Sequence, residues 1–346
     1  MNAIAEVRPI EAQSPVRGAP SESVREGIFE MPGGLHLHHG GRLPDVRIAW
    51  RLAGAASAPV VCALGGISAH RRVCLTEQPR QGWWSEIAGP GRPLDTERCR
   101  VLSFDYLGGS GESTGPRPGE AFPSISTYDQ AEVLARLLDH LGIKALRAIA
   151  GGSYGGMVAL AFGERFPERV GALIVLCATD RPHPLGSAWR AVQRDIVRFG
   201  LQAGRPAEAL ALARALAMST YRSGEEFAAR FAGPPVFEDG RARLPVERYL
   251  AARGASYAAE HRPEAFLCLS ESIDLHRVEA SRICVPTTAV AVREDMLVPL
   301  SEVRALVARL HAARLCEISS IYGHDAFLKE SQQLRGVFAP LFESTC

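Results

Sequence analysis

Residues 148–160 constrain the fold of this 346-residue chain more than any other segment. An apolar, strand-like stretch ends in Gly-Gly-Ser-Tyr-Gly around Ser153 and passes directly into a helix-compatible stretch. A serine between Gly151 and Gly155 in this context predicts a sharp strand-to-helix turn that presents the hydroxyl, because glycine avoids collisions and tolerates strained backbone angles. The five-residue motif alone is weakly informative, but the flanking strand and helix make the prediction specific.

The charge balance limits the classes of partner. Lysine plus arginine (39) nearly equals aspartate plus glutamate (38), so no net field draws the chain to nucleic acid or to an anionic membrane. No apolar run approaches the roughly 18 to 20 residues of a membrane span, and the N-terminus lacks a signal-peptide pattern. We therefore expect small-molecule partners, no membrane association and a cytoplasmic location.

The cysteines and histidines do not predict a metal site. The eight cysteines are scattered without a Cys-x-x-Cys pair and several lie in apolar runs, which favours buried free thiols over disulfides or zinc. His36, His38 and His39 lack companion ligands, so ordinary strand and turn positions are the better interpretation. We expect no metal and no resident cofactor.

Strand-like and helix-like segments alternate through most of the chain. This alternation predicts one α/β domain whose mostly parallel sheet is covered on both faces. Helices are expected at 126–141 and 301–310. Beside the strand that precedes Ser153, strands are expected at 46–52, 60–64, 100–105, 170–177, 286–292 and 315–318.

Two segments depart from this alternation. Residues 1–27 mix Pro, Ser, Glu and Arg without periodicity and predict a flexible N-terminal arm, so the folded domain is expected to span 28–346. Between about 180 and 281 the sequence is rich in alanine and arginine, with helical periodicity and no strand candidates. We interpret this block as a helical insertion that forms a lid over Ser153.

The elbow serine needs two further residues to act as a nucleophile. A base must remove the hydroxyl proton, and the base needs an orienting carboxylate. In folds with this turn, the three residues follow the chain order nucleophile, acid, histidine. The candidates in that order are Ser153, Asp295 and His324. Asp295 and His324 both follow predicted strands, at the sheet edge where the serine is expected. Glu294 and Asp325 are the alternative acids, and Asp295 is favoured because it lies nearest the proline-closed turn.

A tetrahedral intermediate also needs two N–H donors aimed at its oxyanion. The backbone N–H of Tyr154, directly after the nucleophile, is the expected first donor. The second is expected from Gly65 or Gly66, which follow an early strand and permit close backbone approach. The alternative for this double glycine is an ordinary strand-end turn.

Several strings resemble the homoserine O-acyltransferases of the α/β-hydrolase fold. The resemblance covers about residues 45–330, and its most specific parts are the Tyr-Arg-Ser and His-Asp-Ala-Phe-Leu strings. It implies an α/β-hydrolase fold and a homodimer built through the helical lid. The matching strings are Gly-Gly-Ser-Tyr-Gly-Gly-Met at 151–157, Gly-Trp-Trp at 82–84, Gly-Pro-Gly at 89–91, Asp-Tyr-Leu-Gly-Gly at 105–109, Ser-Thr-Gly-Pro at 113–116, Thr-Tyr-Arg-Ser at 220–223 and Gly-His-Asp-Ala-Phe-Leu at 323–328.

The resemblance also implies a ping-pong reaction. Ser153 would take the acyl group from acyl-CoA, a co-substrate, and the side-chain hydroxyl of L-homoserine would then attack it, with His324 as the base in each half. The family's substrate contacts map onto Arg222, for the amino acid's carboxylate, and Asp325, for its ammonium. Arg190 occupies a place that resembles the family's determinant of succinyl over acetyl use, because a guanidinium there would pair with the free carboxylate of a succinyl group.

The predicted activity is transfer of a succinyl group from succinyl-CoA to L-homoserine, in methionine biosynthesis. Homoserine O-acetylation with acetyl-CoA and serine O-succinylation are alternatives, and residues 65–68 differ from the commoner Leu-Thr-Gly form beside the acceptor pocket. An esterase would share the triad but would not need Arg222 and Asp325 for a zwitterion. A non-catalytic binding protein on this fold would normally lack a triad member.

Overall fold

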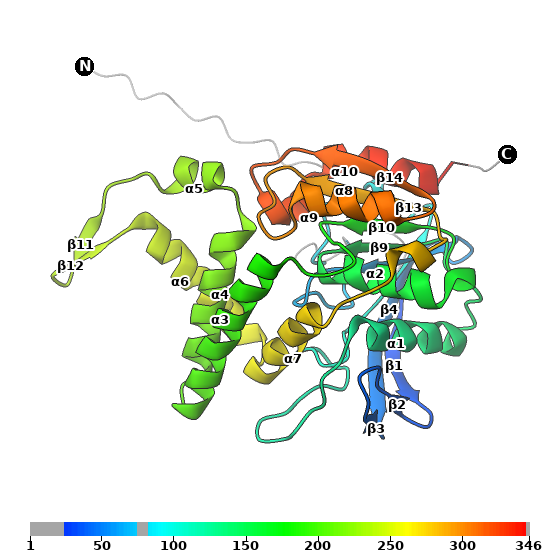
Figure 1. Cartoon of the computed structure of the whole chain (residues 1–346), viewed down its shortest axis with the longest axis horizontal. Coiled ribbons are helices and arrows are strands. Elements are labelled where there is room, and N and C mark those ends of the chain that lie inside the picture. Colours follow the sequence, from blue (N-terminus) through cyan, green and yellow to red (C-terminus); the bar gives the residue numbers. More distant parts are fainter. Residues whose placement is uncertain (1–23, 75–81, 344–346) are drawn as a thin grey trace, which may run out of the picture.

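A twisted eight-stranded sheet forms the centre of the computed structural model, which describes residues 24–74 and 82–343 (Figure 1). In the spatial order given below, the strands β8, β5, β9, β10, β13 and β14 run parallel to one another. Strand β4 is antiparallel to both of its neighbours, β1 and β8. The predicted α/β fold with a mostly parallel sheet is confirmed. In spatial order the strands are β1 (Val24–Met31), β4 (Val46–Gly54), β8 (Arg100–Phe104), β5 (Val60–Leu64), β9 (Ala148–Gly152), β10 (Leu173–Leu176), β13 (Thr287–Val292) and β14 (Ala313–Ile318).

Both faces of the sheet are buried, as the continuous apolar strands require. Alternate residues of a strand point to opposite faces, so Cys62 and Leu64 of β5 join one core cluster, whereas Val61 and Ala63 join another. Helices α1 (Thr127–His140), α2 (Tyr154–Arg165) and α8 (Leu300–Arg309) contribute to the first cluster, and α10 (Ser331–Phe338) contributes to the second. Shorter elements are β2 (Leu35–His36), β3 (Arg42–Leu43), β6 (Ala88–Gly89), β7 (Leu94–Asp95) and α9 (Ala326–Lys329).

Local sequence signals set the ends of α1. The hydroxyl of Ser126 accepts a hydrogen bond from the N–H of Asp129, and the carboxylate of Asp129 accepts one from the N–H of Ser126. This reciprocal pair is a capping box, which satisfies two N–H groups that a helix leaves without partners. Gly142, at a φ of 69°, follows the helix and reverses the chain.

Five α-helices lie between β10 and β13, in the segment expected to form the lid and beside the carboxyl ends of the parallel strands (Figure 1). We refer to this segment as the lid. Most of these helices begin with a proline, which suits the first helical turn because that turn's N–H groups lack intrahelical acceptors. The lid has a small apolar cluster of its own that includes Val197, Leu210 and Phe266. The helices are α3 (Pro184–Gln202), α4 (Pro206–Tyr221), α5 (Gly224–Phe231), α6 (Pro245–Glu260) and α7 (Pro263–Asp274).

The expectation that the insertion holds no strand was wrong. The lid contains a hairpin of β11 (Val236–Glu238) and β12 (Arg241–Arg243), which projects at its outer end (Figure 1). The turn is made by Asp239 and Gly240, whose φ angles of 49° and 73° match the two-residue turns that Asp-Gly favours. The strands are too short for alternation to stand out in the sequence.

The predicted N-terminal arm extended too far. Residues 1–23 lie outside the described residues, but 24–27 belong to β1, which pairs with β4 so that Gly27 lies opposite Trp50. β1 is an edge strand with exposed charged residues, which is typical of edges and hides the apolar alternation. Among the described residues, no helix combines the length and the apolar character that crossing a bilayer requires.

Candidate active site

Ser153 occupies a strained turn between β9 and α2. Its φ of 54° and ψ of −120° are unusual for a residue with a side chain. Two glycines make room for the turn: a Cβ on Gly151 would lie 2.1 Å from the carbonyl oxygen of Gly155, and one on Gly155 would lie 2.4 Å from that of Leu64. The Ser153 N–H donates to the carbonyl of Leu176 (2.8 Å), so the neighbouring strand holds the strained residue.

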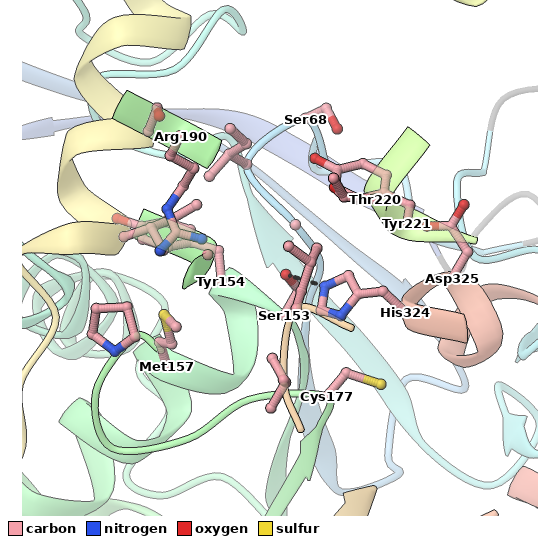
Figure 2. Close-up of a pocket in the computed structure, with 18 of the residues that line it drawn as sticks. Ser68, Ser153, Tyr154, Met157, Cys177, Arg190, Thr220, Tyr221, His324 and Asp325 are labelled. Carbon is pink, nitrogen blue, oxygen red and sulfur yellow. Dashed lines mark hydrogen bonds between the residues drawn. The ribbon is translucent and has the colours of Figure 1, made fainter. Parts of the chain in front are cut away.

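The structure brings Ser153, His324 and Asp295 together, and Figure 2 shows the serine and the histidine. The Nε2 atom of His324 lies 2.9 Å from the Oγ atom of Ser153, and its Nδ1 atom lies 2.7 Å from Oδ2 of Asp295. The other oxygen of Asp295 accepts the N–H groups of Leu297 (2.8 Å) and Val298 (3.0 Å). The three side chains follow β9, β14 and β13, whose carboxyl ends meet at one edge of the sheet. This is the geometry of a nucleophile, a base and an orienting acid.

The environment makes His324 a stronger base than free histidine. Burial alone would lower the pKa of its imidazole, because the charged form loses water. The charge and hydrogen bond of Asp295, with a contribution from the charge of Asp325, outweigh burial and raise the pKa of His324 above its ordinary value. A more basic imidazole takes the hydroxyl proton of Ser153 more readily.

The alternative acids have other partners. The carboxylate of Glu294 accepts hydrogen bonds from the hydroxyl of Ser319 and the N–H of Ser320. Asp325 lies beside Arg222, with its Oδ2 atom 2.9 Å from Nε of the arginine. Neither carboxylate hydrogen-bonds the imidazole, so the geometry favours Asp295 as the orienting acid.

A cavity of about 190 Å³ lies between the triad and the lid. Ser153 and His324 form part of its floor, and α3, α4 and α7 form its roof. Its wall mixes aromatic surface, including Trp83 and Phe266, with a few charged groups. Such a cavity can hold a small acyl group and a polar acceptor next to the hydroxyl.

The two glycines after β5 differ in position. The carbonyl of Gly65 accepts hydrogen bonds from the N–H of Gly155 (2.9 Å) and from the hydroxyl of Tyr106 (2.7 Å), which ties this turn to the elbow. Gly66 and Tyr154 line the cavity, and their N–H groups have no acceptor within the described residues. These two groups are therefore the ones available to an oxyanion.

The two predicted substrate contacts, Asp325 and Arg222, differ in whether they reach the cavity. Asp325 lines the cavity, but Arg222 does not. The Arg222 guanidinium is shared between Asp325 and Glu226, whose Oε1 atom lies 3.2 Å from NH1, and it stacks over Tyr322 at 5.2 Å. Arg222 thus braces Asp325 from outside the cavity.

Arg214 is a residue of the cavity wall that the sequence did not indicate. Its side chain lines the cavity, and its guanidinium lies over the rings of Tyr221 (5.2 Å) and Tyr257 (4.7 Å). No carboxylate forms an ion pair with Arg214 in the part of the chain that the structure describes. The available signal was spacing: Arg214 precedes Tyr221 by seven residues, two helical turns, so both lie on one face of α4.

Arg190 lies on the opposite side of the nucleophile from Asp325. In Figure 2, Arg190 projects from α3 on one side of Ser153, whereas Tyr221 and Asp325 lie on the other. Its guanidinium lines the cavity and is held by Asp274, at 2.6 Å from NH2 and 2.9 Å from Nε. The cavity therefore has a cationic end and a zwitterion-compatible end, with the hydroxyl between them.

Cys177 is a second residue of the cavity wall that the sequence did not indicate. Its φ of 51° makes it, with Ser153, one of the few strained non-glycine residues among those described. Its sulfur, an oxygen of Asp295 and a nitrogen of His324 all lie within 4.8 Å of one another. Burial, followed by the charge of Asp295, raises the pKa of the Cys177 thiol, so the thiol is protonated. Since the imidazole and carboxylate already bond to each other, we interpret the cluster as part of the triad's packing and not as a metal site.

Comparison with known proteins identifies relatives over most of the chain. The family model of the alpha/beta hydrolase fold matches residues 61–331. The chain is 42% identical over 313 residues to a homoserine O-succinyltransferase of Xanthomonas campestris pv. campestris, covering 90% of this chain and 82% of the relative. It is 36% identical over 365 residues to a homoserine O-acetyltransferase of Thermus thermophilus, covering 94% and 93%.

Solved structures show the same fold at lower identity. A homoserine O-acetyltransferase from Bacillus anthracis superposes with a TM-score of 0.83 at 18% identity, covering 93% of this chain and 98% of that one. The esterase E22 superposes with a TM-score of 0.82 at 20% identity, covering 92% and 100%. Transferases and esterases thus share this architecture, and the side chains in the cavity must separate them.

Proposed function

The chain belongs to the homoserine O-acyltransferases of the α/β-hydrolase fold, and we propose that it transfers a succinyl group from succinyl-CoA to the side-chain hydroxyl of L-homoserine. The observation that carries the choice of donor is the guanidinium of Arg190 in the cavity that holds Ser153. The product would be O-succinyl-L-homoserine, an intermediate suited to methionine biosynthesis.

In the first half-reaction, Ser153 attacks the thioester carbonyl of the donor. His324 takes the hydroxyl proton as the new Oγ–C bond forms, and the N–H groups of Tyr154 and Gly66 stabilise the oxyanion. When the C–S bond breaks, the imidazolium returns the proton to the leaving CoA thiolate. The enzyme is left as a succinyl ester on Ser153, with His324 neutral again.

In the second half-reaction, the amino acid's hydroxyl takes the place of CoA. His324 removes its proton, the hydroxyl oxygen attacks the ester carbonyl, and the Oγ–C bond breaks as the imidazolium returns the proton to Ser153. Water would give hydrolysis by the same route. The lid therefore has to exclude water or place the acceptor better than water, which the enclosing aromatic side chains favour.

We assign the acceptor's two charges to opposite sides of one subsite. Asp325 pairs with the ammonium group, and Arg214 pairs with the carboxylate, because Arg214 lines the cavity without an ion-pair partner among the described residues. This replaces the expected role of Arg222, which instead holds Asp325 in place. An esterase for apolar esters would not need this pair of charges, which argues against the hydrolase alternative.

The donor assignment depends on charge. A succinyl group ends in a carboxylate that can form a charge-assisted hydrogen bond with Arg190, whereas an acetyl group ends in a methyl group. The similarity to a homoserine O-succinyltransferase supports succinyl, and the similarity to homoserine O-acetyltransferases keeps acetyl as the second candidate. Serine is the second candidate acceptor, because it differs from homoserine by one methylene group.

We also propose that the enzyme is a homodimer built through the lid. Exposed apolar side chains lie on neighbouring helices of the lid, with Val192 and Phe199 two turns apart on α3 and Leu212 on α4. A second copy would bury them. Light scattering should give twice the chain mass, and Phe199→Asp with Leu212→Asp should give the monomer.

A cytoplasmic location remains a prediction.

The donor and acceptor are tested together by product analysis. The purified enzyme is incubated with succinyl-CoA or acetyl-CoA and with L-homoserine or L-serine, in all four combinations, and products are identified by mass spectrometry. We expect kcat/KM to be highest for succinyl-CoA with L-homoserine. A clear preference for acetyl-CoA would overturn the donor assignment, and a preference for serine would overturn the acceptor.

A further inference from the structure

Arg190 does not act alone at its end of the cavity, because a partly buried carboxylate, that of Asp274, lies behind it. Asp274, the last residue of α7, accepts hydrogen bonds at Oδ1 from Nε (2.9 Å) and NH2 (2.6 Å) of Arg190 and from the hydroxyl of Ser187 (2.7 Å). A carboxylate in this position would repel a second carboxylate in the cavity. By itself, the pair of Arg190 and Asp274 would therefore be a poor site for an anionic acyl group.

A second guanidinium, that of Arg194, offsets the negative charge of Asp274. The NH1 atom of Arg194 donates to Oδ2 of Asp274 (2.6 Å) and to the hydroxyl and carbonyl oxygens of Ser270 (3.1 Å each). The side chains of Arg190, Asp274 and Arg194 are only 14%, 16% and 13% exposed, so water screens them weakly. Two guanidiniums and one carboxylate leave one net positive charge.

Asp274 remains ionised in this cluster. Burial would raise the pKa of its carboxyl, but the hydrogen bond and charge of Arg190, with the hydrogen bonds of Ser187 and Arg194, lower it below the ordinary value. The carboxylate therefore fixes both guanidiniums. Because Arg194 compensates it from behind, the charge of Arg190 remains available to the cavity.

The orientation of Arg190 directs that charge toward a ligand. Its Nε and NH2 groups are occupied by Asp274 and Ser187, whereas NH1 has no acceptor among the described residues. A Cβ on Gly186 would lie 3.3 Å from NH1, so the glycine leaves space beside the guanidinium. Of the three charged residues, Arg190 lines the cavity, and Asp274 and Arg194 lie behind it.

We propose that Arg194 and Asp274 are positioning residues for donor specificity, and that with Arg190 they form a charge array that selects acyl groups ending in a carboxylate. The inference rests on the proposed donor. Asp274 sets the geometry of Arg190, and Arg194 cancels the repulsion that Asp274 would exert on the acyl carboxylate. Neither residue needs to touch the substrate.

The test compares Arg194→Met with the charge-conserving Arg194→Lys in the full-length enzyme. The donors are succinyl-CoA, acetyl-CoA and butyryl-CoA; the last has the same four-carbon acyl length as succinyl-CoA without the carboxylate. We expect Arg194→Met to lower kcat/KM for succinyl-CoA about tenfold, mainly through KM, and to change the neutral donors much less. Arg194→Lys should retain most of the wild-type kcat/KM for succinyl-CoA. Equal losses with all three donors would mean that Arg194 only supports the fold, and would overturn the proposal.

A second variant separates charge from folding. Asp274→Asn keeps both guanidiniums, so the remaining activity should still favour succinyl-CoA over butyryl-CoA, even if loss of the tether to Arg190 lowers the rate. A reversed preference would contradict the charge argument.

The proposed donor and this inference can fail separately. A wild-type preference for acetyl-CoA would overturn the proposed donor alone. Inhibition of the acyl-CoA reaction by free succinate would then be compared with inhibition by free butyrate, and this comparison would test the charge array. We expect succinate to compete better than butyrate in the wild type, and to lose that advantage in Arg194→Met. No advantage in the wild type would overturn the charge array as well.

Discussion

The imidazole of His324 lies 2.9 Å from the hydroxyl of Ser153, although the two residues are 171 positions apart in the chain. Two parallel strands bring them together, β9 before Ser153 and β14 before His324, and Asp295 fixes the ring from the far side at 2.7 Å. The hydrogen bond to Asp295 sets which ring nitrogen faces the serine. The proposed reaction depends on this arrangement and on the charges around the cavity.

Removal of the orienting carboxylate should change both the rate and its pH dependence. A general base must be neutral, so kcat/KM falls as the pH drops through the pKa of His324. Asp295 raises that pKa above the ordinary 6.5, whereas burial lowers it. Asp295→Asn should therefore reduce kcat about 10⁴-fold and move the acidic limb of the residual activity to lower pH. An unchanged acidic limb would show that the limb belongs to another group.

Two arginines near the acceptor subsite should behave differently when shortened. Arg214→Met removes the proposed partner of the amino acid's carboxylate, so KM for L-homoserine should rise tenfold or more, about 1.4 kcal/mol or more, with thermal stability nearly unchanged. Initial rates at saturating donor give KM, and thermal unfolding gives stability.

Arg222→Met is the matched comparison. It leaves the buried carboxylate of Glu226 and the carboxylate of Asp325 without a shared guanidinium, so we expect a lower Tm as well as weaker acceptor binding. A larger effect of Arg222→Met on KM, with Tm unchanged, would return the carboxylate contact to Arg222.

Two substitutions at Cys177 should distinguish the effect of backbone strain on stability from the effect of the thiol on activity. Cys177→Gly removes the cost of a positive φ, which is about 1 kcal/mol, and should unfold at a higher temperature than Cys177→Ala, which keeps that cost. Because the thiol packs against the triad, both variants should lose activity to a similar extent. Full activity in Cys177→Gly would show that the thiol contributes nothing to the positions of Asp295 and His324.

His276 should make the fold sensitive to acid. It is buried between the hydroxyl of Thr127 (2.7 Å) and the carbonyl of Thr179 (3.0 Å), and burial lowers its pKa to about 3. The unfolded chain binds a proton at this residue near pH 6.5 and the folded chain does not, so stability falls as the pH drops from about 6.5 toward 3. Denaturant unfolding between pH 7 and pH 4 should show a shallower fall for His276→Gln. An equal slope would mean that other groups control acid unfolding.

Features encoded in short local strings could be predicted from the sequence. The elbow at Ser153 is fixed by its flanking glycines, and the loops of Asp295 and His324 each follow an apolar strand, so a parallel sheet places all three at one edge. The regular alternation of segments likewise predicts the fold class, which the structure confirms.

Features that depend on distant neighbours could not be predicted. Whether Arg214 or Arg222 faces the cavity depends on where Glu226 and Asp325 lie, and the partner of Arg190 is a residue 84 positions away. Edge strand β1 carries little apolar alternation of its own, because its stability comes from pairing with β4.

Formation of an acyl-enzyme would identify Ser153 as the nucleophile. The wild-type enzyme and Ser153→Ala are incubated with succinyl-CoA in the absence of an amino acid, and intact masses and peptides are measured; circular dichroism verifies that the variant is folded. We predict one added succinyl mass on the Ser153 peptide of the wild type, its loss when L-homoserine is added, and no added mass in the variant. Transfer by Ser153→Ala at a rate near that of the wild type, without an acyl-enzyme, would show that Ser153 is not the nucleophile.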